Sequence, residues 1–387
     1  MNYKRKVNIV VGGRFHSAQT YKALLKLGYD VKIYASSPKR FFKDIKKDDL
    51  IFIPKISQLI QKLFKVKLPR IFNDISSIFF DFCVSVIMRN CDIVWGYNGD
   101  SLYCGKKIKN FHNGIYIVDR ACPHFIFQEK LMLEESKEIS FPYLKHTRIT
   151  RNRFCEEYNL ADKIVVPSKY SFSSFVDFNF SEDKLFIAPL DSNAYMPDLK
   201  SLNAKNKNKK EITIGFVGGS FLRKGTIYLL RAIDKIFDKK IKLILRTDKN
   251  KVFMHREARE ICARNNVVFR PYLKNMADFY SELDIFVLPS IDEGFGMVLF
   301  EALKFQIPVI ASSNVGAIDN LIDRQDFLRV IPKNSNNLKS LILQLIEDEI
   351  LRENIGRNGR KAYEKIISEE KSYMNYVSIL FDQLKNK

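Results

Sequence analysis

Short apolar runs that end in glycines alternate along this chain with segments of helical spacing. The run VNIVV at 7–11 precedes a double glycine, helical spacing follows over 17–27, and a second apolar run covers 31–35. Continuous apolar runs of this length are typical of strands that are buried on both faces of a parallel sheet. Gly28 follows the segment of helical spacing, and a glycine at this position is typical of a helix end. The start of the chain therefore predicts a strand–turn–helix–strand unit.

The same pattern returns in the second half of the chain. An apolar run at 212–217 precedes another double glycine, a helix is predicted over 225–237, and a strand is predicted over 241–246. Three more strands of the first half are predicted at 93–95, 115–118 and 163–166. Two such openings indicate an α/β protein of two Rossmann-like domains that face each other across a cleft.

Polar composition marks the domain boundary. The segment DLKSLNAKNKNKKE at 198–211 is basic and low in complexity, which is typical of a linker. We predict a first domain over 1–198, a linker over 199–211 and a second domain over 212–366. The remaining residues, 367–387, have helical spacing, and we expect a helix that packs back on the first domain.

Composition narrows the class of partner. The 64 Lys and Arg exceed the 44 Asp and Glu and give a net charge of +20, which favours nucleic acid, anionic lipid or phosphorylated substrates. No zinc-finger, RRM or helix-turn-helix pattern accompanies the charge, so nucleic acid is not an expected partner. The six cysteines have no CxxC pair and no histidine at zinc spacing, which indicates free thiols in a reducing compartment.

The apolar segments of the chain indicate where in the cell the protein is expected. The beginning, MNYKRKVNIVVGG, has the pattern of a strand and not of a signal peptide. The longest apolar segment, 75–88, contains Asp81 and is too short to span a bilayer, so we expect a buried helix there. Segments 39–47 and 61–72 interleave cations with apolar residues, as in helices that lie on anionic membranes or in solvated helices with aromatic core contacts. We expect a cytoplasmic protein, at most peripheral on the inner face of the membrane.

The segment 289–317, PSIDEGFGMVLFEALKFQIPVIASSNVGA, combines two carboxylates with a glycine corner. Glu293 precedes Gly-Phe-Gly, and Glu301 lies on the helix predicted after it, between strands at 284–288 and 308–311. Such corners at a helix N-terminus are common ligand sites in α/β proteins. A carboxylate on an apolar helix face costs free energy unless it is paired, which favours a ligand role for Glu301. Glu293 has the alternative of capping the helix.

Further motifs extend this pattern over most of the chain. They are Phe216-Val217-Gly218, Arg223-Lys224-Gly225, Pro289-Ser290, Glu293-Gly294-Phe295-Gly296, Glu301-Ala302 and Pro308-Val309-Ile310-Ala311, with Gly12-Gly13 and NLADKIVVPS at 159–168 in the first half. In this order and spacing the chain resembles the family-4 glycosyltransferases. The resemblance implies the two-domain GT-B fold, a nucleotide-sugar donor and a reaction that retains the anomeric configuration.

The resemblance and the residue chemistry agree on the donor site. Transfer of a sugar leaves negative charge on the departing diphosphate, which fixed dipoles and cations stabilise. Arg223 and Lys224 supply cations, and by resemblance Glu293 contacts the transferred sugar and Glu301 holds the ribose hydroxyls. We expect Arg223, Lys224 and Glu293 to be catalytic. The expected donor-binding residues are Gly12, Gly13, Gly294, Phe295, Gly296, Met297, Val298 and Glu301.

Two positions depart from the family pattern, and one common metal-binding motif is absent from the sequence. Gly219 stands where many relatives have an arginine, with Arg223 as the local substitute, and Gln306 stands where a small residue is common. These departures leave the donor preference open. No Asp-x-Asp metal motif occurs, and the resemblance implies a reaction with no metal or other cofactor.

The first domain should hold the acceptor. The segment 119–135 resembles the acceptor-side loop of the family, with Asp119, Arg120 and His124 as candidate residues. His16, just past the first double glycine, is a further candidate, and a structural role is the alternative for both histidines. Three residues of a later predicted helix are interpreted as its charged surface: Arg151, Arg153 and Glu157.

These features predict an enzyme, a glycosyltransferase of hexosyltransferase type. It would move a sugar from a nucleoside-diphosphate sugar to a glycan or lipid-linked acceptor in cell-surface polysaccharide or lipopolysaccharide synthesis. One alternative is a nucleotide-sugar epimerase of the same fold, which needs no acceptor. Another is a catalytically inactive glycan- or nucleotide-binding protein, against which the presence of Arg223, Lys224, Glu293 and Glu301 argues.

Overall fold

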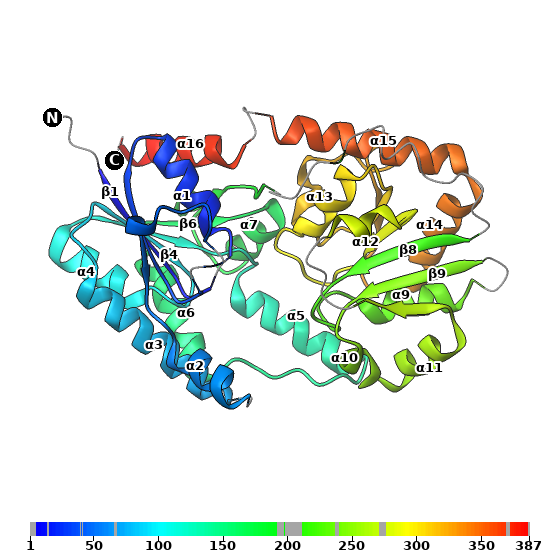
Figure 1. Cartoon of the computed structure of the whole chain (residues 1–387), viewed down its shortest axis with the longest axis horizontal. Helices are drawn as coiled ribbons and strands as arrows, with labels where there is room; N and C mark the ends of the chain where they lie inside the picture. Colours follow the sequence, from blue (N-terminus) through cyan, green and yellow to red (C-terminus); the bar gives the residue numbers. More distant parts are fainter. Residues whose placement is uncertain are drawn as a thin grey trace.

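Two parallel β-sheets of similar topology form the computed structural model, one in each half of the chain (Figure 1). The structure describes residues 5–13, 15–38, 40, 42–65, 68–191, 197, 211–236, 240–270, 276–368 and 372–385. The first sheet has the strand order β3-β2-β1-β4-β5-β6-β7, and the second has β10-β9-β8-β11-β12-β13. Both contain the doubly wound order that reverses at the first strand, so the predicted α/β class with two Rossmann-like domains is confirmed.

The first sheet consists of β1 (Lys6–Val11), β2 (Asp30–Ala35), β3 (Leu50–Phe52), β4 (Ile93–Tyr97), β5 (Ile115–Asp119), β6 (Lys163–Val166) and β7 (Leu185–Ile187). The helices of this half are α1 (Ser17–Lys26), α2 (Ile56–Phe64), α3 (Arg70–Ile87), α4 (Leu102–His112), α5 (Phe125–Glu138), α6 (Arg148–Leu160) and α7 (Lys169–Val176). Of the predicted linker at 199–211, only residue 211 is among the described residues.

The second sheet consists of β8 (Ile212–Val217), β9 (Ile241–Arg246), β10 (Val267–Phe269), β11 (Ile285–Leu288), β12 (Val309–Ser312) and β13 (Leu328–Val330). Its helices are α9 (Thr226–Asp234), α10 (Lys249–Phe253), α11 (Arg256–Arg264), α12 (Ala277–Ser281), α13 (Met297–Lys304), α14 (Ser335–Glu347) and α15 (Glu349–Ile366). The chain ends in α16 (Tyr373–Lys385).

Burial of the central strands explains the apolar runs of the sequence. In β1 every residue after Lys6 is buried, and β4, β6 and β11 are buried along their whole lengths. Helices cover both faces of such a sheet, so neither face of a central strand meets water. The strands predicted at 163–166, 212–217 and 241–246 have these same bounds in the structure.

The last helix, α16, lies against the first domain although it follows the second domain in the sequence (Figure 1). The ring of Phe381 stacks on Trp95 with centroids 6.2 Å apart, and Tyr29 packs edge-on against the same ring at 4.7 Å. Near the start of the helix, the hydroxyl groups of Tyr373 and Thr20 share a hydrogen bond of 2.9 Å. The chain therefore crosses between the domains a second time.

Helix α5 also joins the two domains (Figure 1). Met132 and, just beyond the helix, Ile139 are buried in the hydrophobic core cluster of the second domain. The ring of Phe141 packs against Phe221 with centroids 4.6 Å apart, and Nε2 of His255 lies 2.9 Å from the carbonyl oxygen of Ile139. Residues that precede the linker thus contribute to the core of the second domain.

Helix α3 differs from its prediction. A buried helix was expected over 75–88, but α3 is buried on one face only, where Ser76 and Asp81 lie beside Phe80 and Val84. The carboxylate of Asp81 accepts hydrogen bonds from the backbone N–H groups of Tyr103 (2.7 Å) and Cys104 (3.2 Å) in α4. Apolar residues normally face the core, but this segment is apolar around most of the helix, so its spacing does not determine which face is exposed.

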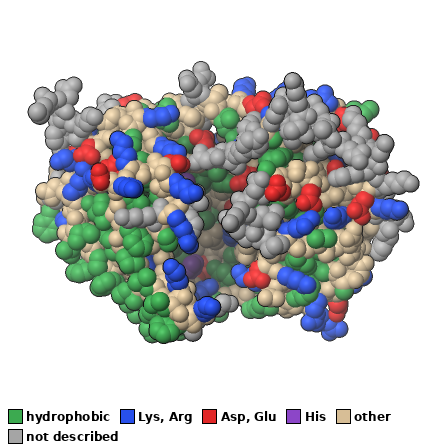
Figure 2. All heavy atoms as spheres, in the orientation of Figure 1, with side chains coloured by type: hydrophobic (Ala, Val, Ile, Leu, Met, Phe, Trp, Pro, Cys, Tyr) green, Lys and Arg blue, Asp and Glu red, His purple; other side chains and the backbone are tan. Residues whose placement is uncertain are grey.

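The outer sides of α2 and α3 form an exposed surface that we call the apolar face. Its side chains are Ile56, Leu59, Leu63, Phe64, Ile71, Phe72, Ile75, Phe79, Phe82, Val86 and Ile87. Figure 2 shows hydrophobic side chains gathered over the part of the first domain where Figure 1 draws these two helices. A contiguous exposed patch of this kind marks an interaction surface. Among the described residues, no helix combines the length and apolar character needed to cross a bilayer.

Replacing Phe381 by alanine removes the ring that packs α16 on Trp95 and Tyr29, and we expect the free energy of unfolding to fall by about 3 kcal/mol. Trp95 is the single tryptophan and is fully buried, so its fluorescence in a urea titration reports on the first domain. The matched variant Phe111→Ala changes a side chain that is 78% exposed and should leave the urea midpoint unchanged. Equal midpoints for Phe381→Ala and the parent protein would contradict this account of the α16 contact.

Candidate active site

Loops at the carboxyl ends of the two sheets meet between the domains, where Figure 2 shows a cleft. The hydroxyl of Ser168, after β6, donates a hydrogen bond of 2.6 Å to the carbonyl oxygen of Gly294, after β11. A Cβ atom on Gly294 would lie 2.3 Å from the carbonyl oxygen of Ala121, after β5. In doubly wound sheets ligands bind at the carboxyl ends, where the strand order reverses. Those points are β1/β4 and β8/β11 in this chain.

Three charged side chains form the centre of the site. Glu293 follows β11, whereas Arg223 and Lys224 lie in the loop after β8. Oε2 of Glu293 is 3.0 Å from a guanidinium nitrogen of Arg223 and 2.5 Å from Nζ of Lys224. The same guanidinium nitrogen donates to the carbonyl oxygen of Asp292 at 3.0 Å, and the N–H of Ile291 donates to the carbonyl of Arg223 at 2.9 Å. Side-chain and backbone contacts therefore hold the two loops together.

Burial and the neighbouring charges shift the pKa values of this cluster in opposite directions. Burial by itself raises the pKa of Glu293, but the charges of Lys224 and Arg223 outweigh it, so the pKa lies below its ordinary value. Burial lowers the pKa of Lys224, and the carboxylate of Glu293 offsets only part of that effect. Glu293 forms ion pairs with both cations, and the carboxylate of Asp292 also acts on Arg223.

Glycines let these loops turn tightly beside the charged cluster. Gly225 precedes α9 with φ of +63°, and a Cβ atom there would lie 2.2 Å from the carbonyl oxygen of Pro289. Gly296 is the N-cap of α13, with φ of +95° and no side-chain capping bond. The carboxylate of Glu293 is held by Arg223 and Lys224, so the alternative that it caps this helix is wrong.

The first turn of α13 lies directly after the glycine corner. Met297 and Val298 are half-buried, whereas the ring of Phe295 is buried and packs against Phe300 with centroids 5.3 Å apart. The first backbone N–H groups of a helix have no partner within it, and they carry its partial positive charge. Met297 and Val298 thus offer backbone amides, while Phe295 supports the loop from the core.

Glu301 is held by a tyrosine in the interior of the second domain. Its carboxylate accepts a hydrogen bond of 2.7 Å from the hydroxyl of Tyr280. Burial raises the pKa of Glu301, and the Tyr280 hydrogen bond and the charge of Lys304 offset this only in part. Burial lowers the pKa of Lys304 to about 8. A carboxylate has two oxygens that each accept more than one hydrogen bond, so Glu301 keeps acceptor capacity for hydroxyl groups of a ligand beside the bond from Tyr280.

In the first domain, Gly12 makes room for a buried ion pair. Its N–H donates to Oδ2 of Asp100 at 3.0 Å, and Nζ of Lys55 is 2.5 Å from the other oxygen of that carboxylate. A Cβ atom on Gly12 would lie 2.1 Å from the Asp100 carboxylate. A Cβ atom on Gly13 would meet the ring of Phe15 at 2.8 Å. Gly12 is therefore required by the packing of the protein itself.

His16 and Asp119 lie together at the carboxyl edge of the first sheet. Nε2 of His16 is 2.8 Å from Oδ2 of Asp119, and the indole N–H of Trp95 donates to the same oxygen at 3.0 Å. The imidazole also packs edge-on against Tyr97 at 5.1 Å and Tyr373 at 5.8 Å. The structure therefore brings two of the four expected acceptor-side residues into direct contact.

Arg120 lies beside the contact between the domains. Its guanidinium donates to the carbonyl oxygen of Pro123 at 3.1 Å and to the side-chain oxygens of Asn98 at 3.3 Å and Gln128 at 3.4 Å. It also lies over the ring of Phe154, 5.4 Å from the centroid. These contacts hold Arg120 in place. Gln128 also donates to Asp292 of the second domain, so Arg120 lies next to that domain.

His124 differs from its expected place on the acceptor side. Its side chain is only 2% exposed and stacks on Phe178 with centroids 4.3 Å apart. The other rings around it are Phe125, Tyr158, Phe175 and Phe180. Burial lowers the pKa of His124 to about 4, so the imidazole is neutral at pH 7. His124 is therefore part of the core of the first domain, which is the structural role given as its alternative.

The helix surface expected at Arg151, Arg153 and Glu157 is wrong for two of the three residues. Arg153 and Glu157 are buried, and Arg153 forms an ion pair with Asp81. The carboxylate of Glu157 accepts hydrogen bonds from the N–H of Ser101 at 3.0 Å and from the side chain of Asn98 at 2.7 Å. Burial raises the pKa of Glu157 to about 7. Charged residues inside a polar network have the same helical spacing as surface residues, so the pattern did not separate them.

Sequence reasoning missed the residues that connect the domains. Asp292 is fully buried, and its carboxylate accepts hydrogen bonds from Gln128 and, at 3.1 Å, from the hydroxyl of Tyr170. The hydroxyl of Ser171 lies 3.3 Å from the carbonyl oxygen of Gly294. The position of Asp292 next to Glu293 was a usable signal, but its partners lie in another domain.

The arrangement is suited to a phosphorylated ligand. The cations Arg223 and Lys224 and the first amides of α13 supply positive charge, and Glu301 supplies a hydrogen-bond acceptor. Among the described residues, no group of three or more His, Cys, Asp or Glu side chains is placed to hold a metal ion.

Comparison with known sequences agrees with this geometry. Residues 199–362 match the model of the family described as "Glycosyl transferases group 1". The capsular polysaccharide biosynthesis glycosyltransferase CapM of Staphylococcus aureus is 30% identical over 161 residues, which span 41% of this chain and 42% of that protein. An uncharacterised glycosyltransferase of Methanocaldococcus jannaschii is 31% identical over 224 residues, which span 55% of this chain and 58% of that protein. The chain thus matches about half the length of these relatives, and its second half is similar to the glycosyltransferase group 1 family.

Comparison with solved structures extends to both domains. Sucrose-phosphate synthase from Thermosynechococcus elongatus has a TM-score of 0.75 at 18% identity, with 99% of this chain and 100% of that chain covered. HepE of Anabaena, solved in complex with UDP-glucose, has a TM-score of 0.67 at 13% identity, with 99% and 100% covered. At these identities the likeness concerns the fold, and it shows that the whole chain has the GT-B architecture.

Replacing Glu293 by glutamine leaves Lys224 and Arg223 without a carboxylate, and we expect the free energy of unfolding at pH 7 to fall by about 3 kcal/mol. The native pKa of Glu293 lies below its ordinary value. Its contribution is therefore complete above the unfolded-state pKa and is lost as the pH falls through the native pKa. Urea titrations of the parent protein and the variant should converge as the pH is lowered through that range.

The control for this experiment is Glu260→Gln, which changes an exposed carboxylate that pairs with Arg256 one helical turn away. This variant should unfold like the parent protein at every pH, because exposed ion pairs contribute little to stability. If Glu293→Gln behaves in the same way, the charged cluster does not hold the two loops together.

Proposed function

We propose that this protein is a glycosyltransferase that moves a sugar from a nucleoside-diphosphate sugar to a glycan or lipid-linked acceptor. The single observation that carries the proposal is the cluster of Arg223, Lys224 and Glu293 beside the first turn of α13, within a glycosyltransferase group 1 domain. The solved relative HepE binds UDP-glucose, and CapM belongs to capsular polysaccharide biosynthesis. We place this protein in cell-surface polysaccharide or lipopolysaccharide synthesis on the same grounds.

In the proposed reaction the second domain holds the donor. The diphosphate lies against Arg223, Lys224 and the amides at the start of α13, which stabilise the charge that develops as the bond from C1 to the diphosphate breaks. Glu301 accepts hydrogen bonds from the ribose hydroxyl groups, and Glu293 contacts the sugar while it holds the two cations. Because these groups are positioned before the ligand arrives, little reorganisation is needed during the reaction.

The first domain presents the acceptor from the other side of the cleft. His16, held by Asp119, and Arg120, held by Asn98 and Gln128, lie on the loops at the carboxyl edge of the first sheet. We propose retention of the anomeric configuration, in keeping with the sequence motifs. The acceptor oxygen then bonds to C1 on the face that the diphosphate leaves, and its proton passes to a diphosphate oxygen.

The site assignment is tested by Lys224→Ala and Glu301→Ala. Lys224→Ala should lower the turnover number about 100-fold, because it removes a cation from the developing diphosphate. Glu301→Ala should weaken nucleotide-sugar binding about tenfold, because it removes hydrogen bonds to the ribose from a carboxylate. The donor is first identified by a thermal-shift panel of UDP-, GDP- and ADP-sugars, since a ligand of the native state raises the melting temperature.

The control variant is Glu349→Ala, which changes an exposed carboxylate at the start of α15. Parent-like kinetics in both site variants would overturn the assignment. Turnover of the nucleotide-sugar without a glycan product would identify the epimerase alternative. Nucleotide-sugar binding without turnover, in the presence of acceptor extracts, would identify the inactive binding protein.

We also propose that the apolar face lies on an anionic membrane surface. Helix α3 buries Phe80 and Val84 together with polar residues, but α2 and α3 leave the side chains of the apolar face exposed, which is unusual for a surface that meets only water. Lys62, Lys65 and Arg70 are exposed beside these apolar side chains. Apolar side chains flanked by cations are the pattern of an interfacial membrane helix, and cations near the surface add attraction to anionic lipid.

Flotation with liposomes tests this contact. The parent protein should float with vesicles that contain phosphatidylglycerol and only weakly with neutral vesicles, and Phe72→Ser combined with Phe79→Ser should lower recovery at least fivefold. The control is Ile331→Ser combined with Ile350→Ser, two exposed apolar residues of the second domain. Equal recovery with anionic and neutral vesicles, or equal recovery of the two double variants, would contradict the proposal.

A further inference from the structure

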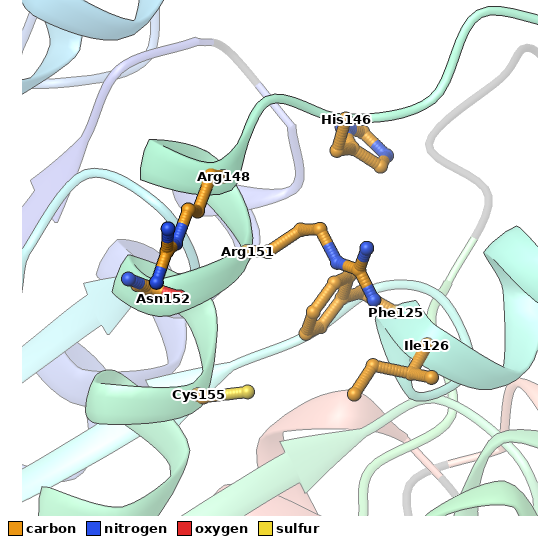
Figure 3. A pocket seen from close by; sticks show the side chains of 7 residues that line it. All are labelled: Phe125, Ile126, His146, Arg148, Arg151, Asn152 and Cys155. Atoms are coloured by element: carbon orange, nitrogen blue, oxygen red, sulfur yellow. The ribbon is translucent and has the colours of Figure 1, made fainter.

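A cationic pocket lies between the start of α5 and the start of α6, outside the charged cluster of the second domain (Figure 3). Its volume is about 430 Å³. Arg148, Arg151 and Asn152 reach it from α6, and Phe125 closes it from α5. His146 adds an imidazole from the segment that precedes α6. Two arginines, a histidine and an amide around one pocket provide hydrogen-bond donors for an anionic group.

The charge of this pocket is only partly neutralised by the protein. Nε of Arg151 is 3.6 Å from Oε2 of Glu129, whose other oxygen accepts a hydrogen bond of 2.7 Å from the N–H of His146. Arg148 is exposed and forms no ion pair with any residue that the structure describes. Arg148 and Arg151 are three residues apart on α6, and in Figure 3 the side chain of Arg148 extends toward Asn152 whereas that of Arg151 extends toward Phe125. Asp74 and Arg70 also act on the charge of His146, so the carboxylates of Glu129 and Asp74 face the three arginines Arg70, Arg148 and Arg151, and the surroundings of the pocket remain positively charged.

The position of α6 adds to this charge. The pocket lies at the N-terminus of the helix, where Thr147 caps it by accepting a hydrogen bond of 3.2 Å from the N–H of Thr150. The N-terminal end of a helix carries partial positive charge and favours anions. Guanidinium groups bind phosphate oxygens in a bidentate manner. A phosphate or diphosphate group therefore suits this pocket better than a neutral sugar.

The pocket is joined to the apolar face. Arg70, at the start of α3, donates to the carbonyl oxygens of Leu144 and Lys145, and Thr147 donates to Asp74 of the same helix. Leu144 is 66% exposed. The segment that leads into the pocket thus runs against the helix that carries most of the apolar face. A ligand with an anionic head and an apolar tail would find both surfaces side by side.

Aromatic side chains connect the pocket with the acceptor side of the cleft. The ring of Phe154 lies 6.0 Å from His146 and 5.3 Å from Phe125, measured between centroids. The guanidinium of Arg120 lies over the ring of Phe154, 5.4 Å from its centroid. Through Gln128 the same arginine is linked to Asp292, which precedes Glu293. The pocket is therefore close to the place where the acceptor would meet the donor sugar.

We propose that this pocket binds the phosphate head of a lipid-linked acceptor, while the lipid tail lies along the apolar face. The inference rests on the proposed glycosyltransferase function, because it names the class of acceptor for that reaction. Arg148 and Arg151 bind the phosphate oxygens, with His146 and Asn152 as further hydrogen-bonding groups. The sugar end of the acceptor then extends past Phe154 toward Arg120 and the cleft.

Calorimetric titration with farnesyl diphosphate, an amphiphile with a diphosphate head and an apolar tail, tests the pocket. The titration uses the full chain in the Lys224→Ala background, so that binding at the proposed donor site contributes little. Farnesyl diphosphate should bind at least tenfold more tightly than inorganic pyrophosphate, which lacks the tail, and than farnesol, which lacks the charge. Arg148→Ser combined with Arg151→Ser should weaken farnesyl diphosphate binding at least tenfold.

The matched control is Arg256→Ser combined with Arg259→Ser, which removes two exposed arginines at the same spacing from α11 of the second domain. This control should bind farnesyl diphosphate like the background protein. A second variant, Phe72→Ser combined with Phe79→Ser, should weaken farnesyl diphosphate but not pyrophosphate. Equal affinities of the Arg148/Arg151 variant and its control, or equal affinities for farnesol and farnesyl diphosphate, would overturn the proposal.

The test separates this inference from the proposed function. If nucleotide-sugar turnover is found and farnesyl diphosphate binding does not depend on Arg148 and Arg151, the pocket assignment fails and the glycosyltransferase stands. If farnesyl diphosphate binding depends on both arginines and no nucleotide-sugar binds, the glycosyltransferase fails and a lipid-phosphate site stands.

Discussion

The pairing of one carboxylate, Glu293, with Arg223 and Lys224 is the interaction on which the candidate site depends. Two adjacent cations in a largely buried loop repel each other, and burial opposes the charge on each of them. The carboxylate from the neighbouring strand end compensates for this and ties the loop after β8 to the loop after β11. Those two loops flank the point where the strand order reverses. The cations are thereby fixed beside the helix N-terminus of α13 before any ligand binds.

The same loop also connects the two domains. Asp292 and Gly294, on either side of Glu293, accept hydrogen bonds from Gln128, Tyr170 and Ser168 of the first domain. Gln128 in turn contacts Arg120, so the charged cluster of the second domain and Arg120 of the first share one network of contacts. Helix α5 extends into the core of the second domain, and α16 returns the end of the chain to the first domain, which reinforces this arrangement. Movement of one domain would therefore disturb the charged cluster and the contacts of Arg120.

The strands, the glycine corners and the charged motifs followed from the sequence because they depend on local spacing. Apolar runs before double glycines predict β1 and β8, and the motifs that contain Glu293 and Arg223 predict a shared site but not the contact between them. His124 and the Arg153–Glu157 pair were misjudged because burial depends on distant partners, here Phe178 and Asp81. For the same reason the sequence did not show which face of α3 is exposed, nor that Arg148 and Arg151 line a pocket with His146.

The most direct test of the central claim compares nucleoside diphosphates with the matching monophosphates by calorimetric titration of the parent protein and Lys224→Ala. If Arg223 and Lys224 bind the second phosphate, the parent protein should bind the preferred diphosphate at least tenfold more tightly than its monophosphate. In Lys224→Ala this difference should shrink to about threefold or less. Equal affinities for the two nucleotides in the parent protein, or an undiminished difference in the variant, would contradict the account.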